Sequence, residues 1–490
     1  MLLTKSNYLL GLQCSKLLWV AKNDKQRIPE PDKIAQAKFT EGNIIGVLAT
    51  KVFEQGIDLS GLDFNENLDK TKQALKERKP IFEAGFLVND LFSRGDILFP
   101  AREDEWDIIE VKSATQVKEV NLYDVAFQKY VYEKAGLKIR NCILMHVNNQ
   151  YVRDGGIEPS ELFILADVTE KMVEFSEGIE ERIKEMLELI KSKEKPKCAI
   201  GVYCSNPYDC ALKDECWRGV PEESVFEFYR MFKKKCFELY SEGICCMKDV
   251  PEDIMLNDKQ KIQRRLACDG GKHMDKLGIK NFLNNLKYPI YYLDFETINP
   301  VLPKFNGMKP YQRIPFQFSL HVQDKPNGDL KHVSFLAEGV SDPRPKFMQA
   351  LKDNLADKGS ILVYNQSFEK GVMNECSDAL PEFKEWYEEN ILPRIKDLWD
   401  VFRNFYYYDP RQKESASIKY VLPAMSDLSY SDMEIGNGAL ASLEYERITY
   451  EENVSDKEKK KVRDALEKYC ELDTLAEVEI VKGLGEVVEK

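Results

Sequence analysis

The feature that most constrains the fold is a pair of apolar, strand-like runs, far apart in the chain, that carry charged residues at alternate positions. One is "IIEVK" at 108–112, and the other is "YPIYYLDFET" at 288–297. Alternate residues of a strand share one face of a sheet, so each run predicts a charged cluster at the edge of a hydrophobic core. Because 490 residues exceed one ordinary core, two such runs in separate regions predict two α/β domains.

The chain divides into three stretches of different character. Residues 1–220 alternate helical and strand patterns and end in a cysteine-dense stretch. Residues 221–285 are charged and helical in pattern, which is typical of a connector. Residues 286–490 begin with the second strand run and end in a long charged helix expected at 455–485. We therefore expect an α/β protein of two domains joined by a helical connector.

Composition excludes several classes of protein. A hydrophobic content of 43% and an aromatic content of 11% are those of a folded chain. No apolar run approaches the ~20 residues of a membrane helix, and Gln13 and Lys16 interrupt the apolar N-terminal stretch. A cytoplasmic protein with no membrane partner is expected. The net charge of −13 argues against broad nonspecific adhesion to nucleic acid, although a nuclease needs only a local basic rim.

Acidic residues in the third stretch follow the order that a two-metal phosphodiesterase requires. With 83 acidic residues, about 14 acid-x-acid pairs arise by chance, so one pair means little. Here, "ILVYNQSFEKGVM" also predicts a strand leading into a helix, and "LEKYCELDTLAEVEI" predicts a helix with Tyr and Asp at i and i+4. Four carboxylates around two cations roughly 3.5–4 Å apart suit phosphodiester hydrolysis. The candidates are Asp294, Glu296, Glu369 and Asp473, with Tyr469 placed to orient the attacking water.

This order resembles the DEDD exonucleases of DnaQ type. Their motifs are D-x-E on a first strand, N-x-x-F-acid in the middle and, in the DEDDy branch, Y-x-x-x-D on a late helix. The resemblance implies an RNase H-like fold for residues 286–490 and 3′→5′ removal of nucleotides with Mg²⁺ or Mn²⁺. One departure is Glu369, where the family usually has Asp; the longer side chain moves the carboxylate outward, and Asp397 is an alternative ligand. The competing interpretation is that these acids are surface residues beside core strands.

A second charged pattern lies in residues 93–115, which predict two strands joined by a polar turn. Asp96 begins the first strand, and Glu110 and Lys112 share one face of the second. A carboxylate pair that holds a divalent cation beside a lysine suits phosphodiester hydrolysis, because the ammonium group stabilises developing phosphate charge. The helix expected at 125–136 places two polar residues on one face. These are Gln128 and Tyr132.

This second pattern resembles the PD-(D/E)XK nucleases of RecB type, whose D…E-x-K core precedes a Q-x-x-x-Y helix. The resemblance implies a restriction-endonuclease-like core in residues 1–220, metal binding by Asp96 and Glu110, and a supporting acid at Glu83. Many relatives also have a metal-ligating histidine in the N-terminal helical part, and this chain has none there. The first histidine, His146, lies in an apolar strand pattern and is expected to be a core residue.

Twelve cysteines in a reducing compartment predict metal ligands and buried thiols instead of disulfides. One lies near the N-terminus, and three follow at regular spacing in "CSNPYDCALKDEC". RecB-type nucleases with an iron–sulfur cluster, including CRISPR-associated and AddB-type enzymes, share this arrangement, which implies a [4Fe–4S] cluster. Zinc is the alternative, and Cys198 is a fifth candidate ligand. The four implied ligands are Cys14, Cys204, Cys210 and Cys216.

Together the two resemblances predict a metal-dependent nuclease with two hydrolytic centres that acts on the ends or single strands of DNA. Two alternatives stay open at this point. One is an RNA-processing exonuclease in which the first domain grips the substrate, and the other is a nucleic-acid-binding protein with both centres degenerate. The whole chain resembles a bacterial family that fuses an iron–sulfur RecB-type nuclease to a DnaQ-like exonuclease. Repair, defence and CRISPR adaptation are all compatible pathways.

Overall fold

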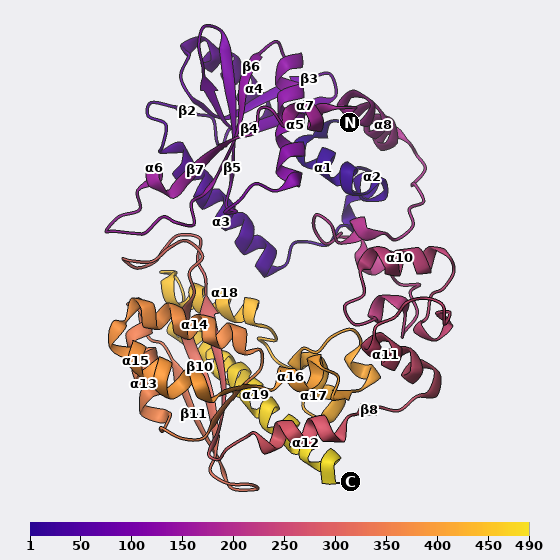
Figure 1. Cartoon of the computed structure of the whole chain (residues 1–490). Helices are drawn as coiled ribbons and strands as arrows, with labels where there is room; N and C mark the ends of the chain where they lie inside the picture. The colour runs from indigo at the N-terminus through magenta and orange to yellow at the C-terminus, as the bar shows by residue number, and fades with distance from the viewer. Residues whose placement is uncertain (490) are drawn as a thin grey trace. The chain divides into compact units, whose positions relative to one another are not determined.

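The computed structural model describes residues 1–489 and shows a mixed α/β protein (Figure 1). The chain forms two compact units. The first unit contains Met1–Gly219 and Val301–Tyr311, and the second contains Val220–Pro300 and Gln312–Lys490. Each unit has its own sheet. Within residues 1–489, no helix combines the length and apolar character that a bilayer crossing requires.

The first unit is built on a seven-stranded mixed sheet. Its continuous strand order is β2-β3-β4-β5-β6-β7, and β1 pairs with β4. The pairs β1–β4, β2–β3 and β5–β6 are parallel, and the other neighbours are antiparallel. The strands are β1 (Leu3–Thr4), β2 (Ile57–Asp58), β3 (Ile81–Val88), β4 (Leu91–Pro100), β5 (Glu105–Lys112), β6 (Lys138–Val147) and β7 (Phe163–Asp167).

Helices cover both faces of this sheet. Ile108 points into the core beneath α5 (Glu119–Lys134), whereas Ile109 and Val111 pack in the core on the opposite face beside α3 (Lys33–Thr50). Strand alternation therefore turns Glu110 and Lys112 toward the α5 face. The remaining helices of this unit are α1 (Lys5–Gln13), α2 (Ser15–Asn23), α4 (Phe64–Ala74), α6 (Pro159–Leu162), α7 (Met172–Ser176), α8 (Ile179–Lys191) and α9 (Lys213–Cys216).

A short segment from later in the chain, Val301–Tyr311, completes the first unit. Val301 is buried in the core on the α3 face. The backbone N–H of Arg153 donates to the carbonyl of Met308 at 2.9 Å, and its guanidinium donates to the carbonyl of Pro303 at 2.8 Å. The hydroxyl of Tyr311 donates to the carbonyl of Ser113 at 2.6 Å. The segment thus supplies both apolar packing and hydrogen bonds.

The second unit is built on a five-stranded mixed sheet in the order β11-β10-β9-β12-β13, with a separate two-stranded sheet of β14 and β8. β9 pairs antiparallel with β10 and parallel with β12. The strands are β8 (His273–Met274), β9 (Ile290–Ile298), β10 (Ile314–Gln323), β11 (Leu330–Leu336), β12 (Ser360–Val363), β13 (Ile395–Asp397) and β14 (Tyr407–Tyr408).

Alternation along β9 decides which side chains meet the long C-terminal helix. Leu293 and Phe295 belong to the core that includes α13 (Arg344–Asn354) and α14 (Gln366–Ala379), whereas Tyr292 belongs to the core that includes α19 (Asp456–Glu489). Asp294 and Glu296 share the parity of Tyr292 and therefore face α19. Figure 1 shows α19, in yellow, running along the sheet. The other helices are α10 (Lys233–Ser241), α11 (Asp258–Asp269), α12 (Lys276–Asn284), α15 (Lys384–Trp386), α16 (Trp399–Arg403), α17 (Ile418–Met425) and α18 (Gly438–Tyr450).

Candidate functional site

Three carboxylates that are far apart in the sequence meet between β9 and α19. Ligand oxygens of Asp294, Glu296 and Asp473 all lie within 4.8 Å of one another. Glu296 and Asp473 are each 7% exposed. The arrangement follows from two periodicities, because positions i and i+2 of a strand share a face and α19 lies over that face. Such a compact group of buried oxygens is the ligand type that hard divalent cations prefer.

Two further buried glutamates extend this group. Glu369, in the first turn of α14, is 2% exposed, and Glu477, one turn after Asp473 on α19, is 1% exposed. The Oε2 atom of each has no hydrogen-bond partner. We refer to Asp294, Glu296, Glu369, Asp473 and Glu477 as the acidic cluster.

Burial and neighbouring charges raise the pKa values of the carboxyl groups in the acidic cluster. Burial and the negative charge of Asp473 raise the pKa of Glu296 to about 8. Burial raises the pKa of Asp473 to about 6. Burial, followed by the charges of Asp473, Glu296 and Glu369, raises the pKa of Asp294 well above its usual range. The charge of the nearby Lys419 ammonium group lowers the pKa of both Glu296 and Asp473. Bound divalent cations would favour the ionised form of these carboxyl groups, so the oxygen donor set fits them.

Tyrosine hydroxyls hold the carboxylate of Asp473. The hydroxyl of Tyr430 donates to Asp473 Oδ1 at 2.6 Å. Tyr469, one helical turn before Asp473, also hydrogen bonds to this carboxylate. Burial and the charge of Asp473 raise the pKa of Tyr469, so its phenol stays protonated and acts as a hydrogen-bond donor.

Asp397, the alternative ligand expected from the sequence, has a different partner set. Its carboxylate accepts hydrogen bonds from the backbone N–H groups of Asn365 at 2.9 Å, Gln366 at 3.2 Å and Trp399 at 3.0 Å. These bonds satisfy N–H groups at the starts of α14 and α16. Glu369, not Asp397, is the residue whose charge acts on Asp294.

A pocket of about 450 Å³ opens over the acidic cluster. Asp294, Asp473 and Glu477 line one part of it, and Arg230 and Trp399 line another. The volume lies within the 300–1,000 Å³ range of ligand pockets. Its other lining residues are Tyr229, Tyr364, Asn365 and residues 414–418.

Sequence reasoning missed three residues of this site. Tyr430 lies in a loop with no pattern that would single it out. Lys419 lies in α17, whose sequence has no charge pattern that would indicate a site. Of the three, Glu477 is the easiest to predict from the sequence, because it continues the i, i+4 spacing of Tyr469 and Asp473 along α19.

A second charged group forms in the first unit, around Glu110. Its Oε1 accepts hydrogen bonds from Lys112 Nζ at 2.7 Å and from Lys5 Nζ at 2.8 Å, and its Oε2 accepts one from Gln128 Nε2 at 2.6 Å. Lys112 also donates to Asp124 Oδ2 at 2.7 Å. We refer to Asp96, Glu110, Lys112, Asp124 and Lys5 as the lysine-paired centre.

The charges of the lysine-paired centre largely compensate one another. Burial alone would raise the pKa of Glu110, but the charges of Lys112 and Lys5 lower it below its usual range. Asp96 accepts a hydrogen bond from the backbone N–H of Val111 at 2.6 Å, and burial and the charge of Glu110 raise its pKa to about 7. Lys5 takes the position beside Glu110 that a cation would need. The residues in this arrangement therefore do not fit a metal ion unless Lys5 moves.

The remaining predicted residues of the first unit lie around this centre. The hydroxyl of Tyr132 donates to the carbonyl of Ala84 at 3.2 Å. A side chain at Gly95 would collide with Tyr132 and Gln128, so the close approach of α5 to β4 requires glycine there. Burial raises the pKa of Glu83, which has a φ of 58°, in the left-handed region. His146 is buried in β6, as expected from its apolar surroundings.

Five cysteines from two distant segments gather in the first unit. Cys14, between α1 and α2, packs with Cys210 and Cys216 in one small core. It also shares a hydrogen bond with Cys198, and burial raises its pKa to about 11. Cys204 lies close enough for its charge to raise the pKa of Cys210, for which burial is the larger cause. The thiol donor set fits an iron–sulfur cluster, and the structure does not single out four of the five.

The fold and site define an α/β protein with a buried acidic cluster under a pocket of about 450 Å³. A family model described as a domain of unknown function, DUF2779, matches residues 291–417, a range that includes Asp294, Glu296 and Glu369. Uncharacterized protein MG366 of Mycoplasma genitalium is 29% identical over 231 residues, which are 43% of this chain and 34% of that protein.

A second relative has a similar extent. Uncharacterized protein UU173 of Ureaplasma parvum is 24% identical over 229 residues, which are 42% of this chain and 32% of that protein. An MG366 homolog in Mycoplasma pneumoniae is 27% identical over 232 residues. The chain thus spans about a third of the length of these relatives. Their names and the family description state no activity.

Proposed function

We propose that the chain is a metal-dependent nuclease whose hydrolytic centre is the acidic cluster of the second unit. The observation that carries this proposal is the meeting of Asp294, Glu296 and Asp473 within 4.8 Å, beside two more buried carboxylates. Burying so many acids together is costly unless cations neutralise them. A solvated or purely structural role would not require this arrangement.

The residues of the chain have distinct tasks in this proposal. Bound divalent cations would supply charge stabilisation for the attacking and leaving oxygens of a phosphodiester. Asp294, Glu296 and Asp473 would hold those cations. Tyr430 keeps the carboxylate of Asp473 in one orientation through its 2.6 Å hydrogen bond. Tyr469, protonated because of its raised pKa, would direct the attacking water by hydrogen bonding.

The pocket supports a nucleotide as the substrate unit. Arg230 lies 6.0 Å from the ring centre of Trp399, so a cation and an aromatic face stand together on the pocket wall. An aromatic ring can stack on a base of any sequence, and a guanidinium group can bind a phosphate. Single-stranded DNA ends and 3′→5′ polarity come from the resemblance to DnaQ-type exonucleases, with RNA as the alternative substrate.

The proposal is tested with end-labelled single-stranded DNA, duplex DNA and RNA. We expect degradation with Mg²⁺ or Mn²⁺ and loss of that activity when EDTA removes the metal, because the cluster alone offers only negative charge to a phosphodiester. Readdition of Mg²⁺ should restore the rate. No degradation of any of the three substrates with either metal would overturn the proposal.

For the first unit, the position of Lys5 weighs against a second hydrolytic centre, and a role in holding nucleic acid is then the first candidate. Lys5 Nζ lies 2.8 Å from Glu110 and 3.7 Å from Asp124, so both carboxylates are already paired. A metal-dependent centre with Asp96 and Glu110 as ligands stays the second candidate. It requires that Lys5 leave Glu110.

Replacing Lys5 by methionine tests this point. Because one partner of a buried ion pair is removed, we expect the first unit to lose about 3 kcal/mol of stability. Mg²⁺ or Mn²⁺ should recover part of that loss in Lys5→Met, since Glu110 becomes available to a cation. Thermal unfolding with and without metal measures both effects, and Lys25→Met, at an exposed position, is the matched control. Equal metal response in parent, control and variant would contradict the interpretation.

We also propose that the cysteine group holds a [4Fe–4S] cluster. Its support is the convergence of Cys14 with thiols near residues 198–216, which lie in a different part of the sequence. A cluster there would tie the N-terminal helices to the segment that follows α8.

A further inference from the structure

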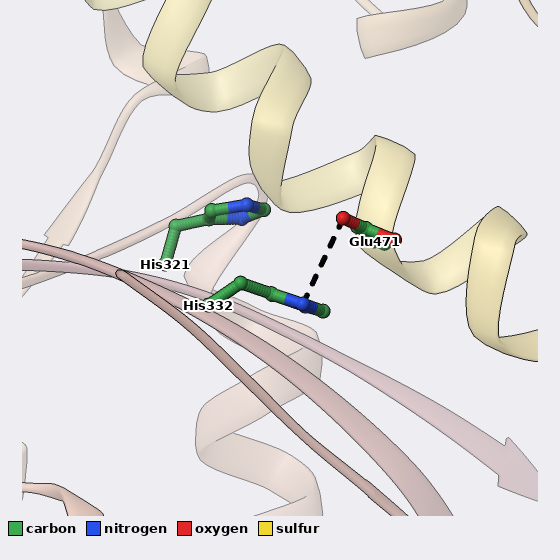
Figure 2. A group of neighbouring side chains, drawn as sticks. All are labelled: His321, His332 and Glu471. Carbon is green, nitrogen blue, oxygen red and sulfur yellow. Dashed lines mark ion pairs between the residues drawn. The ribbon is translucent and has the colours of Figure 1, made fainter. Parts of the chain in front are cut away.

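A second group of potential metal ligands lies on the outer edge of the second unit's sheet, apart from the acidic cluster. It consists of His321 on β10, His332 on the edge strand β11 and Glu471 on α19. Figure 2 shows both imidazole rings turned toward the Glu471 carboxylate. One ligand atom from each of the three lies within 4.8 Å of the other two. None of the three belongs to the proposed nuclease machinery.

Strand pairing and helix packing bring these residues together. His321 and His332 are directly opposed partners in the antiparallel pair β10–β11. Opposed residues project from the same face of a sheet, and their rings here lie 4.5 Å apart and nearly parallel. α19 crosses this face and presents Glu471 to them. His321 is 4% exposed, while the side chains of His332 and Glu471 are 28% and 47% exposed.

The hydrogen bonds around the group fix which ring nitrogens carry protons. Thr474 Oγ1 must donate to the carbonyl of Glu471 at 3.1 Å, since a carbonyl only accepts. Thr474 Oγ1 therefore accepts from Ser319 Oγ at 2.7 Å and from His321 Nδ1 at 2.8 Å. Because the Ser319 proton points to Thr474, Ser319 Oγ accepts from His332 Nε2 at 2.9 Å.

When both rings are neutral, this chain of donors leaves one lone pair free on each ring. The free atoms are Nε2 of His321 and Nδ1 of His332. A metal-binding histidine normally donates its other N–H to a neighbouring oxygen, which fixes the tautomer and the ring orientation. Both histidines here meet that condition before any metal is present.

The separations suit a tetrahedral ion. Bonds of about 2.0–2.1 Å at tetrahedral angles place ligand atoms roughly 3.4 Å apart. His332 Nδ1 and Glu471 Oε1 are already 3.7 Å apart. Both of these side chains are partly exposed, so they can close the remaining gap by small rotations. Imidazole and carboxylate together favour Zn²⁺ over Mg²⁺, which prefers oxygen ligands.

We propose that His321, His332 and Glu471 form a Zn²⁺ site with a fourth, water-accessible position. The ion would join the edge strand β11 and its neighbour β10 to α19. That helix also presents Tyr469 and Asp473, so the ion would stabilise the helix that carries them. This proposal rests on the hydrogen bonds and distances around the three residues, and it does not depend on the proposed nuclease activity.

Zn²⁺ binding, measured in excess Mg²⁺, tests the site. Mg²⁺ occupies oxygen-only sites, and the cysteines are the same in every variant, so a difference between variants reports the histidine group. We expect His332→Gln and Glu471→Gln each to bind one equivalent of Zn²⁺ fewer than the parent chain. Glu467→Gln, an exposed position one turn earlier on α19, should keep that equivalent. Equal Zn²⁺ stoichiometry and affinity in all four proteins would overturn the proposal.

Two further measurements keep the test decisive. Thr474→Val keeps all three ligands but removes the oxygen that orients His321, so Zn²⁺ affinity should fall about 10–100-fold. If a variant fails to fold, the parent protein alone suffices: Zn²⁺ should slow amide hydrogen exchange in both β10–β11 and the middle of α19 relative to Mg²⁺. Unchanged exchange in these segments would refute the site.

Discussion

The double variant Asp294→Asn/Asp473→Asn should lose metal-dependent nuclease activity by at least about 10³-fold. Each substitution removes a charged ligand from the compact part of the acidic cluster, where the three carboxylates lie within 4.8 Å. Cations held there would stabilise the charge of the transition state and lower the activation free energy by several kcal/mol. Each 1.36 kcal/mol corresponds to about tenfold in rate. Initial rates on end-labelled single-stranded DNA, at saturating Mg²⁺ or Mn²⁺, measure the effect.

The loss should not come from unfolding. Burial raises the pKa values of both aspartates, and the charges of neighbouring carboxylates raise that of Asp294 further. Neutral asparagines of similar shape remove this cost, so the unfolding temperature should stay level or rise. Asp464→Asn, at an exposed position of the same helix, controls for loss of a negative charge and should keep the parent rate. A double variant that degrades its substrate as fast as the parent would show that the acidic cluster is not the hydrolytic centre.

Replacing Cys204 by serine should remove bound iron and destabilise the first unit. A cluster shared with Cys14 would cross-link segments far apart in the sequence, and a cross-link that closes a loop of about 100 residues or more stabilises by roughly 4 kcal/mol. For a domain of this size that corresponds to a fall of about 8–16 °C in the unfolding temperature. Iron content, visible absorbance and thermal unfolding after anaerobic purification measure the three consequences.

Cys268→Ser is the control, because Cys268 is exposed and lies in the second unit. It should retain iron and the parent unfolding temperature. Parent protein that contains zinc in place of iron would identify the alternative metal. Parent protein with neither metal would mean that these cysteines are buried free thiols.

Local periodicity was enough to predict several elements and the core of the acidic cluster. The two strands expected within 93–115 are β4 and β5, and the long C-terminal helix is α19. Alternation along one strand placed Asp294 beside Glu296, and the spacing of Tyr469 and Asp473 placed both on one face of α19. These features depend on residues close in sequence.

Residues that reach the sites from distant segments were not predictable. Lys5 lies in the first helix and has no local signal that it would pair with Glu110, more than a hundred residues later. Tyr430 reaches Asp473 from a loop. The cross-strand register that opposes His321 to His332 likewise depends on how two strands align. Such contacts follow from tertiary packing, which no short pattern encodes.

The segment Val301–Tyr311 belongs to the first unit although it follows β9 of the second unit in the chain. The polypeptide passes between the units three times, after Gly219, Pro300 and Tyr311. During synthesis the first unit cannot complete its core until the ribosome has also translated β9, so part of the second unit is made before the first unit is complete. Cleavage at any one of these junctions would not separate the two units cleanly.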